Sequence, residues 1–359
     1  MTHYLSAMAG RIRAAARALA GSRADPPRSP QGIQTLINGY QHTALICLAA
    51  RLRLADHLGN GPRTSAQLAQ ALGAHAPSLH RVLRGLVTLG VCSEAPDGRF
   101  ALTALGAELR SDSPAAARGL ALLTGEEYAP AWGNLLYTVM TGEPAFRHCF
   151  GMNTLEHRAK HPELNDHFNK GLALGAARVA PAILAAYDFS AFRSVTDVGG
   201  GQGALLAALL QAHPHLNATL FERPPVAAAA RAQFQAAGVS ERCRVVEGDF
   251  FDHLPGGADA LILKSVLHDW DDERAAALLR NCRQALSAQG RLLIIERLLP
   301  ERAADDPAAI VVDLQMLALT GGRERSEADH RALLNASGFA LARVLRTAAG
   351  FSILEAART

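Results

Sequence analysis

A histidine stands at the end of an apolar run in the segment LILKSVLHDWDDE, where a buried strand gives way to acidic residues. An imidazole takes up a proton near neutral pH, so His268 is a candidate general base, although a lone histidine there is more often a packed core residue. Two carboxylates favour catalysis. Glu296 ends the apolar segment RLLIIE, and Glu324 follows a pair of glycines. We therefore expect Glu296 to hold the His268 imidazole and Glu324 to assist from the other side.

A second group of residues has the spacing of a nucleoside site. The loop DVGGGQG follows an apolar run, and its glycines let a ligand approach the backbone closely. Glu222 ends the next apolar run, where an acid can bind both ribose hydroxyls. This pattern alone also fits a dinucleotide fingerprint, because Gly199, Gly201 and Ala204 satisfy G-x-G-x-x-A.

Three details favour S-adenosylmethionine over a dinucleotide. Asp197, before the glycines, would repel a pyrophosphate but suits the ammonium of an amino acid. Asp249 and Phe250, in the segment EGDFF, suit the amino group and the face of an adenine. The chain also ends in two strand-like segments, FALARVLRT and FSILEA, which must form an antiparallel hairpin because only AAG separates them. Such a hairpin is foreign to plain dinucleotide folds.

The elements that position these residues alternate between strand and helix from Ser194 onward. The strand segments are continuously apolar, as in ADALILK, which is typical of a parallel sheet covered on both faces. The sequence thus predicts an α/β domain with a Rossmann-like, doubly wound sheet and an antiparallel C-terminal hairpin.

The N-terminal half has a different pattern. Helical spacing over residues 33–58 precedes two shorter helices, ending at Leu72 and Leu89, and a hairpin of VCSE and RFALT. Together these elements have a winged-helix pattern. We expect a flexible leader over residues 1–30, a mainly α, winged-helix-like dimerisation domain over 31–113, a helical connector lining the substrate pocket over 114–187, and the ligand-binding domain over 188–359.

Composition excludes several classes of protein. The 359 residues carry a formal net charge of only +3, so no broad field for nucleic acid is present. No apolar run approaches the ~20 residues that span a bilayer. The five cysteines include no C-x-x-C pair, which indicates free thiols in a reducing compartment and argues against zinc. We expect a cytoplasmic protein without a bound metal, nucleic-acid partner or membrane segment.

The segments DVGGGQG, FERP, EGDFF, LKSVLHDWDDE, RLLIIE and GGRERS, in this order, resemble the class II small-molecule O-methyltransferases. The resemblance covers nearly the whole chain after Gln31. Within the family, the sequence is most similar in character to bacterial enzymes that modify phenazines or aromatic polyketides. It implies a homodimer in which His268 is the base, flanked by Glu296 and Glu324. Many members have aspartate at the position of Glu222, but the longer side chain still reaches a ribose.

The resemblance also implies contacts with the cofactor, and we expect a second set of residues at the acceptor. The set expected at S-adenosylmethionine consists of Asp197, Gly199, Gly201, Glu222, Asp249, Phe250 and Lys264. The set expected at the acceptor consists of Trp132, Phe146, Met152, Asp269 and Met316.

The predicted reaction is methylation of an aromatic hydroxyl group on a secondary metabolite. A phenol has a pKa near ~10, so its neutral form is a poor nucleophile at pH 7 until a base takes its proton. Two alternatives stay open: a non-methylating relative that decarboxylates or hydroxylates, and a winged-helix regulator that binds DNA. The sequence does not identify the substrate or the hydroxyl group.

Overall fold

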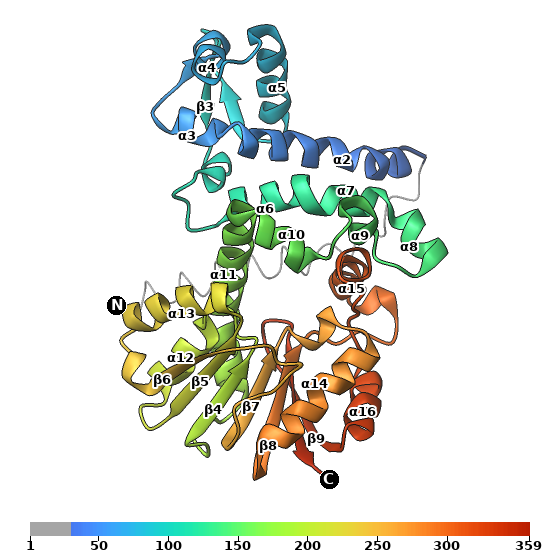
Figure 1. Ribbon diagram of the computed structural model, residues 1–359. Helices are drawn as coiled ribbons and strands as arrows, with labels where there is room; N and C mark the ends of the chain where they lie inside the picture. The colour runs from blue at the N-terminus through green and yellow to red at the C-terminus, as the bar shows by residue number, and fades with distance from the viewer. Residues whose placement is uncertain (1–29) are drawn as a thin grey trace, which may run out of the picture.

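A long helix joins two parts of the chain. A computed structural model describes residues 30–359, with a helical part above a part built on a sheet (Figure 1). Helix α11 (Pro162–Ala186) runs between them. Its Leu164 packs in the N-terminal core, while Ala180 and Ile183 pack against the sheet, so this helix ties the two cores together. The leader expected over residues 1–30 lies outside the described residues, except for Pro30.

The N-terminal part contains the expected short helices and hairpin. A capping box starts the first short helix, because Thr64 and Gln67 each accept a hydrogen bond from the other's backbone N–H. The hairpin strands pair antiparallel in a small sheet of order β1-β3-β2. The elements are α2 (Pro30–Arg51), α3 (Leu54–Gly59), β1 (Arg63–Thr64), α4 (Ser65–Leu72), α5 (Ala76–Thr88), β2 (Cys92–Glu94) and β3 (Arg99–Leu102).

The prediction of one continuous helix over residues 33–58 is wrong. The chain breaks between α2 and α3, where Arg53 has a left-handed backbone with φ of 51°. The break directs Leu54, Ala55 and Leu58 of α3 into the N-terminal core. Periodicity does not reveal this break, because both helices have apolar residues at helical spacing.

The connector is mostly helical, as expected. Its elements before α11 are α6 (Ala117–Leu123), a π-helical segment (Thr124–Tyr128), α7 (Ala129–Gly133), α8 (Leu135–Thr141), α9 (Ala145–Phe150) and α10 (Thr154–Lys160).

The C-terminal part is a seven-stranded sheet of order β6-β5-β4-β7-β8-β10-β9. Strands β4 to β8 pair in parallel, whereas β10 is antiparallel to both β8 and β9. The predicted Rossmann-like sheet with a terminal antiparallel hairpin is confirmed. The strands are β4 (Ser194–Val198), β5 (Asn217–Glu222), β6 (Cys243–Glu247), β7 (Ala258–Lys264), β8 (Leu286–Glu296), β9 (Phe339–Arg346) and β10 (Ser352–Arg358).

Helices cover both faces of the sheet, which explains the continuously apolar strands. In β7, Ala260 and Ile262 pack with the helices on one face, whereas Leu261 and Leu263 pack with those on the other. The first face is covered by α12 (Ala204–Ala212), α13 (Pro224–Ala236) and the end of α11. The second is covered by α14 (Asp272–Ala285) and α16 (Glu327–Ala336). Helix α15 (Pro307–Leu319) lies instead beside the connector helices (Figure 1).

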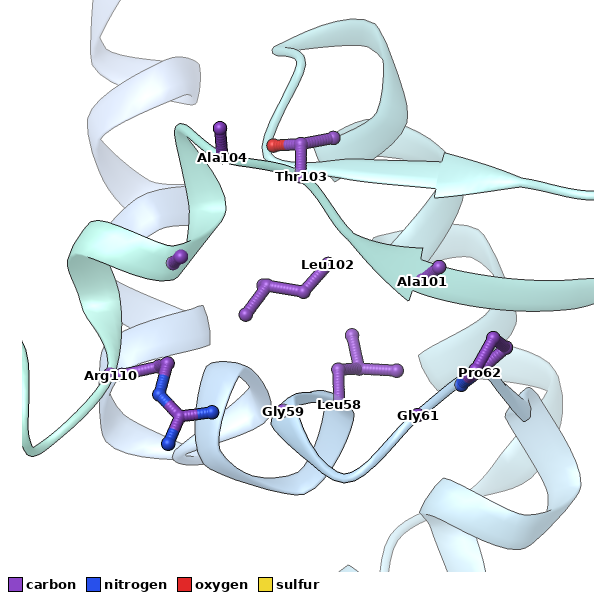
Figure 2. A pocket seen from close by; sticks show the side chains of 10 residues that line it. Leu58, Gly59, Gly61, Pro62, Ala101, Leu102, Thr103, Ala104 and Arg110 are labelled. Atoms are coloured by element: carbon purple, nitrogen blue, oxygen red, sulfur yellow. The ribbon is translucent and has the colours of Figure 1, made fainter.

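A pocket of about 350 Å³ lies in the N-terminal part, between α3 and the end of β3 (Figure 2). Leu58 and Leu102 point into it, and Arg110 stands at one end. The Arg110 guanidinium already donates two hydrogen bonds to Asp112, so its charge is paired. None of the residues expected to bind the cofactor or the acceptor lines this pocket.

Candidate active site

The predicted site residues converge where the chain reverses its course across the sheet. From β4 the chain proceeds outward through β5 and β6, and then returns to the other side of β4 with β7 and β8. Ligands of open α/β sheets bind at the carboxyl ends of the strands at such a reversal. The glycine loop follows β4 and His268 follows β7, and these strands pair in parallel with Asp197 opposite Ile262. The fold therefore places both at one edge.

The glycine loop has a backbone that other residues rarely adopt. Gly199, Gly201 and Gly203 have φ angles of 70°, 61° and 78°, all in the left-handed region. At Gly203 a Cβ would also lie only 2.3 Å from the ring of Phe234. The glycines let the chain turn tightly from β4 into α12 and leave a half-buried backbone that a ligand can approach closely.

Asp197 is buried at the end of β4, and its Oδ1 has no hydrogen-bond partner. Burial raises the pKa of Asp197 to about 7, although the charge of Lys264 on the neighbouring strand lowers it. Burial lowers the pKa of the Lys264 ammonium, and the charge of Asp197 opposes that shift. An unpaired buried carboxylate oxygen is costly, so this position suits a ligand that brings a positive hydrogen-bond donor.

Glu222 ends β5 beside the same loop. Its carboxylate accepts hydrogen bonds from the backbone N–H groups of Gly201 at 2.9 Å and Arg223 at 2.7 Å. Burial raises the pKa of Glu222, against the effect of these hydrogen bonds. Since each carboxylate oxygen has two lone pairs, the side chain is held in place and can still accept hydrogen bonds from a diol.

Asp249 and Phe250 lie just beyond the third strand of the domain. That strand, β6, ends at Glu247, so both residues stand in the segment that follows it. Asn281 donates a hydrogen bond of 2.9 Å to the Phe250 carbonyl. A Cβ on Gly199 would lie 3.6 Å from the Phe250 ring, so the ring borders the glycine loop.

The His268 imidazole is held by Glu324. Its Nδ1 lies 2.7 Å from Glu324 Oε1, and the two side chains are 17% and 1% exposed. A carboxylate at Nδ1 favours the neutral tautomer with hydrogen on that nitrogen, which leaves a lone pair on Nε2. Nε2 lies 3.9 Å from Asp269 Oδ1, beyond hydrogen-bond distance, so it is the nitrogen that a hydroxyl group can reach.

Acidic neighbours strengthen this base. Burial lowers the pKa of His268, but the charge of Asp269, the hydrogen bond to Glu324 and the charge of Glu296 outweigh burial and raise it to about 9. The ring therefore carries a proton in the ligand-free protein at pH 7. It acts as a base only after that proton has left, which a cationic ligand nearby would favour.

Glu296 does not hold the imidazole, so the expectation from the sequence is wrong on this point. Its Oε1 accepts hydrogen bonds from the backbone N–H groups of residues 266–268, at 3.2, 2.8 and 3.2 Å. Its Oε2 lies 3.6 Å from Nε2 of the buried His330. Because β8 runs directly beside β7, Glu296 meets the turn's backbone, whereas Glu324 reaches the ring from the segment after α15.

Arg325, which the sequence analysis did not single out, and Gly322, of the glycine pair before Glu324, shape the turn that carries His268. The fully buried Arg325 donates hydrogen bonds of 2.9 Å to the carbonyls of residues 267 and 270, and bonds of 2.7 and 2.9 Å to the carboxylate of Asp272. Gly322 packs behind the turn, where a Cβ would lie 2.0 Å from the His268 carbonyl oxygen. The only sign in the sequence that Arg325 belongs to the site was its position next to Glu324.

The residues expected at the acceptor lie on the connector, on α15 and beside the base. Trp132 is half-buried, and its indole N–H donates to Gln315 on α15. Met316, the next residue on α15, is half-buried, as is Met152 after α9. Asp269 follows His268 directly in the turn. The bond between Trp132 and Gln315 joins the connector to α15.

Phe146 differs from these residues because it is completely buried. It packs against Phe150, with ring centroids 4.5 Å apart, and against His157 at 5.4 Å. In this arrangement its ring contributes to the packing of the connector rather than offering surface to a ligand.

The comparisons with known families agree with this geometry. Residues 132–340 match the O-methyltransferase domain, and residues 34–112 match the O-methyltransferase dimerisation domain. The chain belongs to the O-methyltransferase family. The expected family, fold, enzyme class and cofactor are confirmed, and the protein is an S-adenosylmethionine-dependent O-methyltransferase.

Three relatives of this O-methyltransferase show the range of the family. It is 45% identical over 322 residues to the phenazine O-methyltransferase PhzM of Lysobacter antibioticus, covering 89% of this chain and 94% of the relative. It resembles NcsB1, an O-methyltransferase from neocarzinostatin biosynthesis solved with S-adenosylmethionine and 2-hydroxy-5-methyl naphthoic acid. That comparison has a TM-score of 0.80 at 37% identity and covers 89% and 96% of the two chains. Aclacinomycin 10-hydroxylase RdmB of Streptomyces purpurascens is 39% identical over 300 residues, covering 82% of this chain and 80% of the relative.

Three further properties concern residues 30–359 of the O-methyltransferase, which the structure describes. No helix in residues 30–359 is long and apolar enough to cross a membrane. Within the same range, no group of three or more His, Cys, Asp or Glu side chains is arranged to hold a metal ion. All five cysteines are free thiols.

Proposed function

We propose that the enzyme methylates a hydroxyl group of an aromatic small molecule, with His268 as the general base. The observation that carries the proposal is the hydrogen bond between His268 and Glu324 at the carboxyl end of β7, next to the glycine loop of β4. A base held by a buried carboxylate beside a nucleoside site suits proton removal from an acceptor. The printed names of two relatives, a phenazine O-methyltransferase and a 2,7-dihydroxy-5-methyl-1-naphthoate 7-O-methyltransferase, support an aromatic acceptor.

The residues at the strand ends fit S-adenosylmethionine. The unpaired Oδ1 of Asp197 suits the ammonium, Glu222 suits the ribose hydroxyls, and Phe250 beside the glycine loop suits the face of the adenine. Asp249 and Lys264 complete the proposed set, together with the backbone of Gly199 and Gly201. When bound, this cofactor supplies an electrophilic methyl group.

The protein's own residues divide the remaining work. His268 Nε2 takes the proton of the acceptor hydroxyl, because a neutral phenol with a pKa near ~10 is a weak nucleophile. Glu324 at Nδ1 orients the ring and stabilises the imidazolium that results. Glu296 acts one step away, since it holds the backbone of the turn and thereby fixes where the ring stands.

The enzyme is expected to work as a homodimer. Helix α2, within the part that matches the dimerisation domain, exposes large apolar side chains. Ile33, Leu36, Ile37 and Tyr40 are 57% to 67% exposed. A monomer would leave this row in water, whereas a second copy can bury it.

His268→Ala tests the proposal. We expect kcat for methyl transfer from labelled S-adenosylmethionine to a panel of phenols to fall ~10²–10⁴-fold, the usual effect of losing a positioned base. Affinity for S-adenosylhomocysteine, measured by calorimetry, should stay near the wild-type value, because the His268 side chain is not among the groups proposed to bind it. A near wild-type rate from pH 6 to 9 would show that His268 is structural. A hydroxylated rather than methylated wild-type product, identified by mass, would instead support a reaction like that named for RdmB.

A further inference from the structure

A buried ion pair in the connector has no part in the mechanism above. Glu127 is completely buried, and Arg158 is 6% exposed. Arg158 donates from Nη2 and Nε to Glu127 Oε2, at 2.8 and 3.0 Å, while its guanidinium lies 3.6 Å from the centroid of the Phe168 ring. His157 Nδ1 lies 3.3 Å from Glu127 Oε1. We name Glu127, His157 and Arg158 the connector cluster.

Stability alone is a poor explanation for this cluster. A buried ion pair loses much of its Coulombic gain to desolvation, so apolar packing of similar volume is often at least as stable. The backbone is also unusual here. Glu127 lies in the π-helical segment (Thr124–Tyr128), in which the N–H of Ala129 bonds to the Thr124 carbonyl. Such segments are rare and often occur at functional sites.

Direct contacts link the connector cluster to the segment that carries Glu324. The His157 ring packs against Phe150, with centroids 4.6 Å apart, and against Phe146 at 5.4 Å, and both phenylalanines belong to α9. Pro144, just before α9, lies 3.0 Å from the point where a Cβ on Gly321 would stand. The glycine that follows packs against the backbone of the His268 turn. The cluster therefore lies one helix away from the base.

The charge of Arg158 also acts on the same turn. Burial raises the pKa of Asp269, and the positive charges of His268 and Arg158 both oppose that rise. Asp269 thus experiences the base and the connector cluster at once. An acceptor whose hydroxyl group meets His268, next to Asp269, would therefore also experience the charge of Arg158.

Arg158 keeps one donor group available. Nε and Nη2 both bond to Glu127, whereas Nη1 has no hydrogen-bond partner among the described residues. A guanidinium only donates, so Nη1 can bond to an acceptor atom of a ligand. Glu127 already balances the positive charge of Arg158, so a carboxylate would add a negative charge without a partner. A neutral carbonyl oxygen can accept the hydrogen bond without adding a charge.

We infer that Arg158 is a specificity residue whose Nη1 donates a hydrogen bond to a neutral carbonyl oxygen of the aromatic acceptor. This inference rests on the proposed function and narrows its substrate class to hydroxylated aromatic ketones and quinones. Glu127 fixes the guanidinium by accepting hydrogen bonds from Arg158 Nε and Nη2, and the Phe168 ring packs against one face of the guanidinium plane.

The experiment measures binding of matched acceptors with S-adenosylhomocysteine at saturation. The probes are the 1-, 2-, 3- and 4-hydroxy isomers of 9-fluorenone and the corresponding hydroxyfluorenes, which lack the carbonyl. We expect at least one fluorenone to bind the wild type ~10-fold or more tighter than its partner, as for a hydrogen bond to a charged group. Arg158→Lys keeps a charge for Glu127 but loses the planar fork, so the preference should shrink to within ~3-fold. Arg147→Lys, an exposed arginine on α9, is the matched control and should keep it.

If Arg158→Lys melts at a much lower temperature than the wild type, the double variant Glu127→Gln/Arg158→Met replaces it in the binding experiment. This variant removes both charges of the ion pair and so leaves no unpaired buried charge. The inference is overturned if the wild type shows no preference for any fluorenone, or if the Arg158 variants retain the preference. Methyl transfer to the same probes is followed separately by mass. A preference that depends on Arg158 without any methyl ether formed would refute the proposed function while supporting recognition of the carbonyl.

Discussion

Replacing Glu324 with glutamine separates the charge of this residue from its hydrogen bond. In the wild type, His268 Nδ1 lies 2.7 Å from Glu324 Oε1, and the Glu324 side chain is 1% exposed. Glutamine keeps an acceptor atom at this position but removes the buried negative charge. Burial lowers the pKa of His268, and Asp269, Glu324 and Glu296 together raise it from 6.5 to about 9. Without the Glu324 charge we expect this pKa to fall by about one unit or more, where one unit corresponds to about 1.36 kcal/mol.

The lower pKa affects the rate in two opposite ways. At pH 7 about 1% of rings with a pKa of 9 are neutral, against about 10% with a pKa of 8, so more of the variant is ready to act as a base. The weaker base and the less stabilised imidazolium slow proton removal at every pH. We expect kcat/KM of Glu324→Gln to be ~10–100-fold below wild type on the alkaline plateau and the deficit to be ~10-fold smaller at pH 7.

The assay is kcat/KM for methyl transfer from pH 6 to pH 10.5, in wild type and Glu324→Gln. Glu327→Gln, at a glutamate at the start of α16 whose side chain is 43% exposed, is the matched control and should follow the wild-type profile. If Glu324→Gln keeps the wild-type inflection, or loses the same factor at every pH, then the carboxylate does not set the strength of the base and the reasoning is refuted.

Three further predictions follow from the same geometry. Wild-type affinity for S-adenosylhomocysteine should weaken as the pH falls through about 7, because a protonated Asp197 cannot pair with an ammonium. Asp197→Asn should bind weakly at every pH. Calorimetry that shows no pH dependence in the wild type would contradict this. Gly322→Ala should lower kcat ~10-fold or more, because its Cβ would stand 2.0 Å from the His268 carbonyl oxygen, yet leave S-adenosylhomocysteine affinity within ~2-fold; equal losses in both would point to general damage. The raised pKa of His268 stabilises the fold fully below pH 6.5, and this contribution is lost as the pH rises to about 9. Urea unfolding over this range should show a smaller decline in His268→Asn than in wild type.

The positions of Asp197 and Glu222 could be predicted from the sequence because they depend on local patterns. Asp197 and Glu222 stand at the ends of apolar runs, and parallel strands bring their carboxyl ends to one edge whatever the details of packing. His268 could be placed at the same edge for the same reason. The apolar run ADALILK also predicted a strand covered on both faces, which the packing of β7 confirms.

Only the tertiary structure decided how the acids divide their roles. Glu324 and His268 are 56 residues apart, and Glu127 and Arg158 are 31 apart, so no local pattern states which atoms meet. The sequence determined that His268 and two carboxylates share an edge. Because β8 pairs with β7, Glu296 accepts hydrogen bonds from the backbone of the His268 turn. The path of the segment after α15 brings Glu324 to the His268 ring. The order of strands follows from the hydrophobic pattern and the chain connections. A hydrogen bond requires that two atoms be positioned to within a few tenths of an ångström, and only the packing of the whole fold sets such positions.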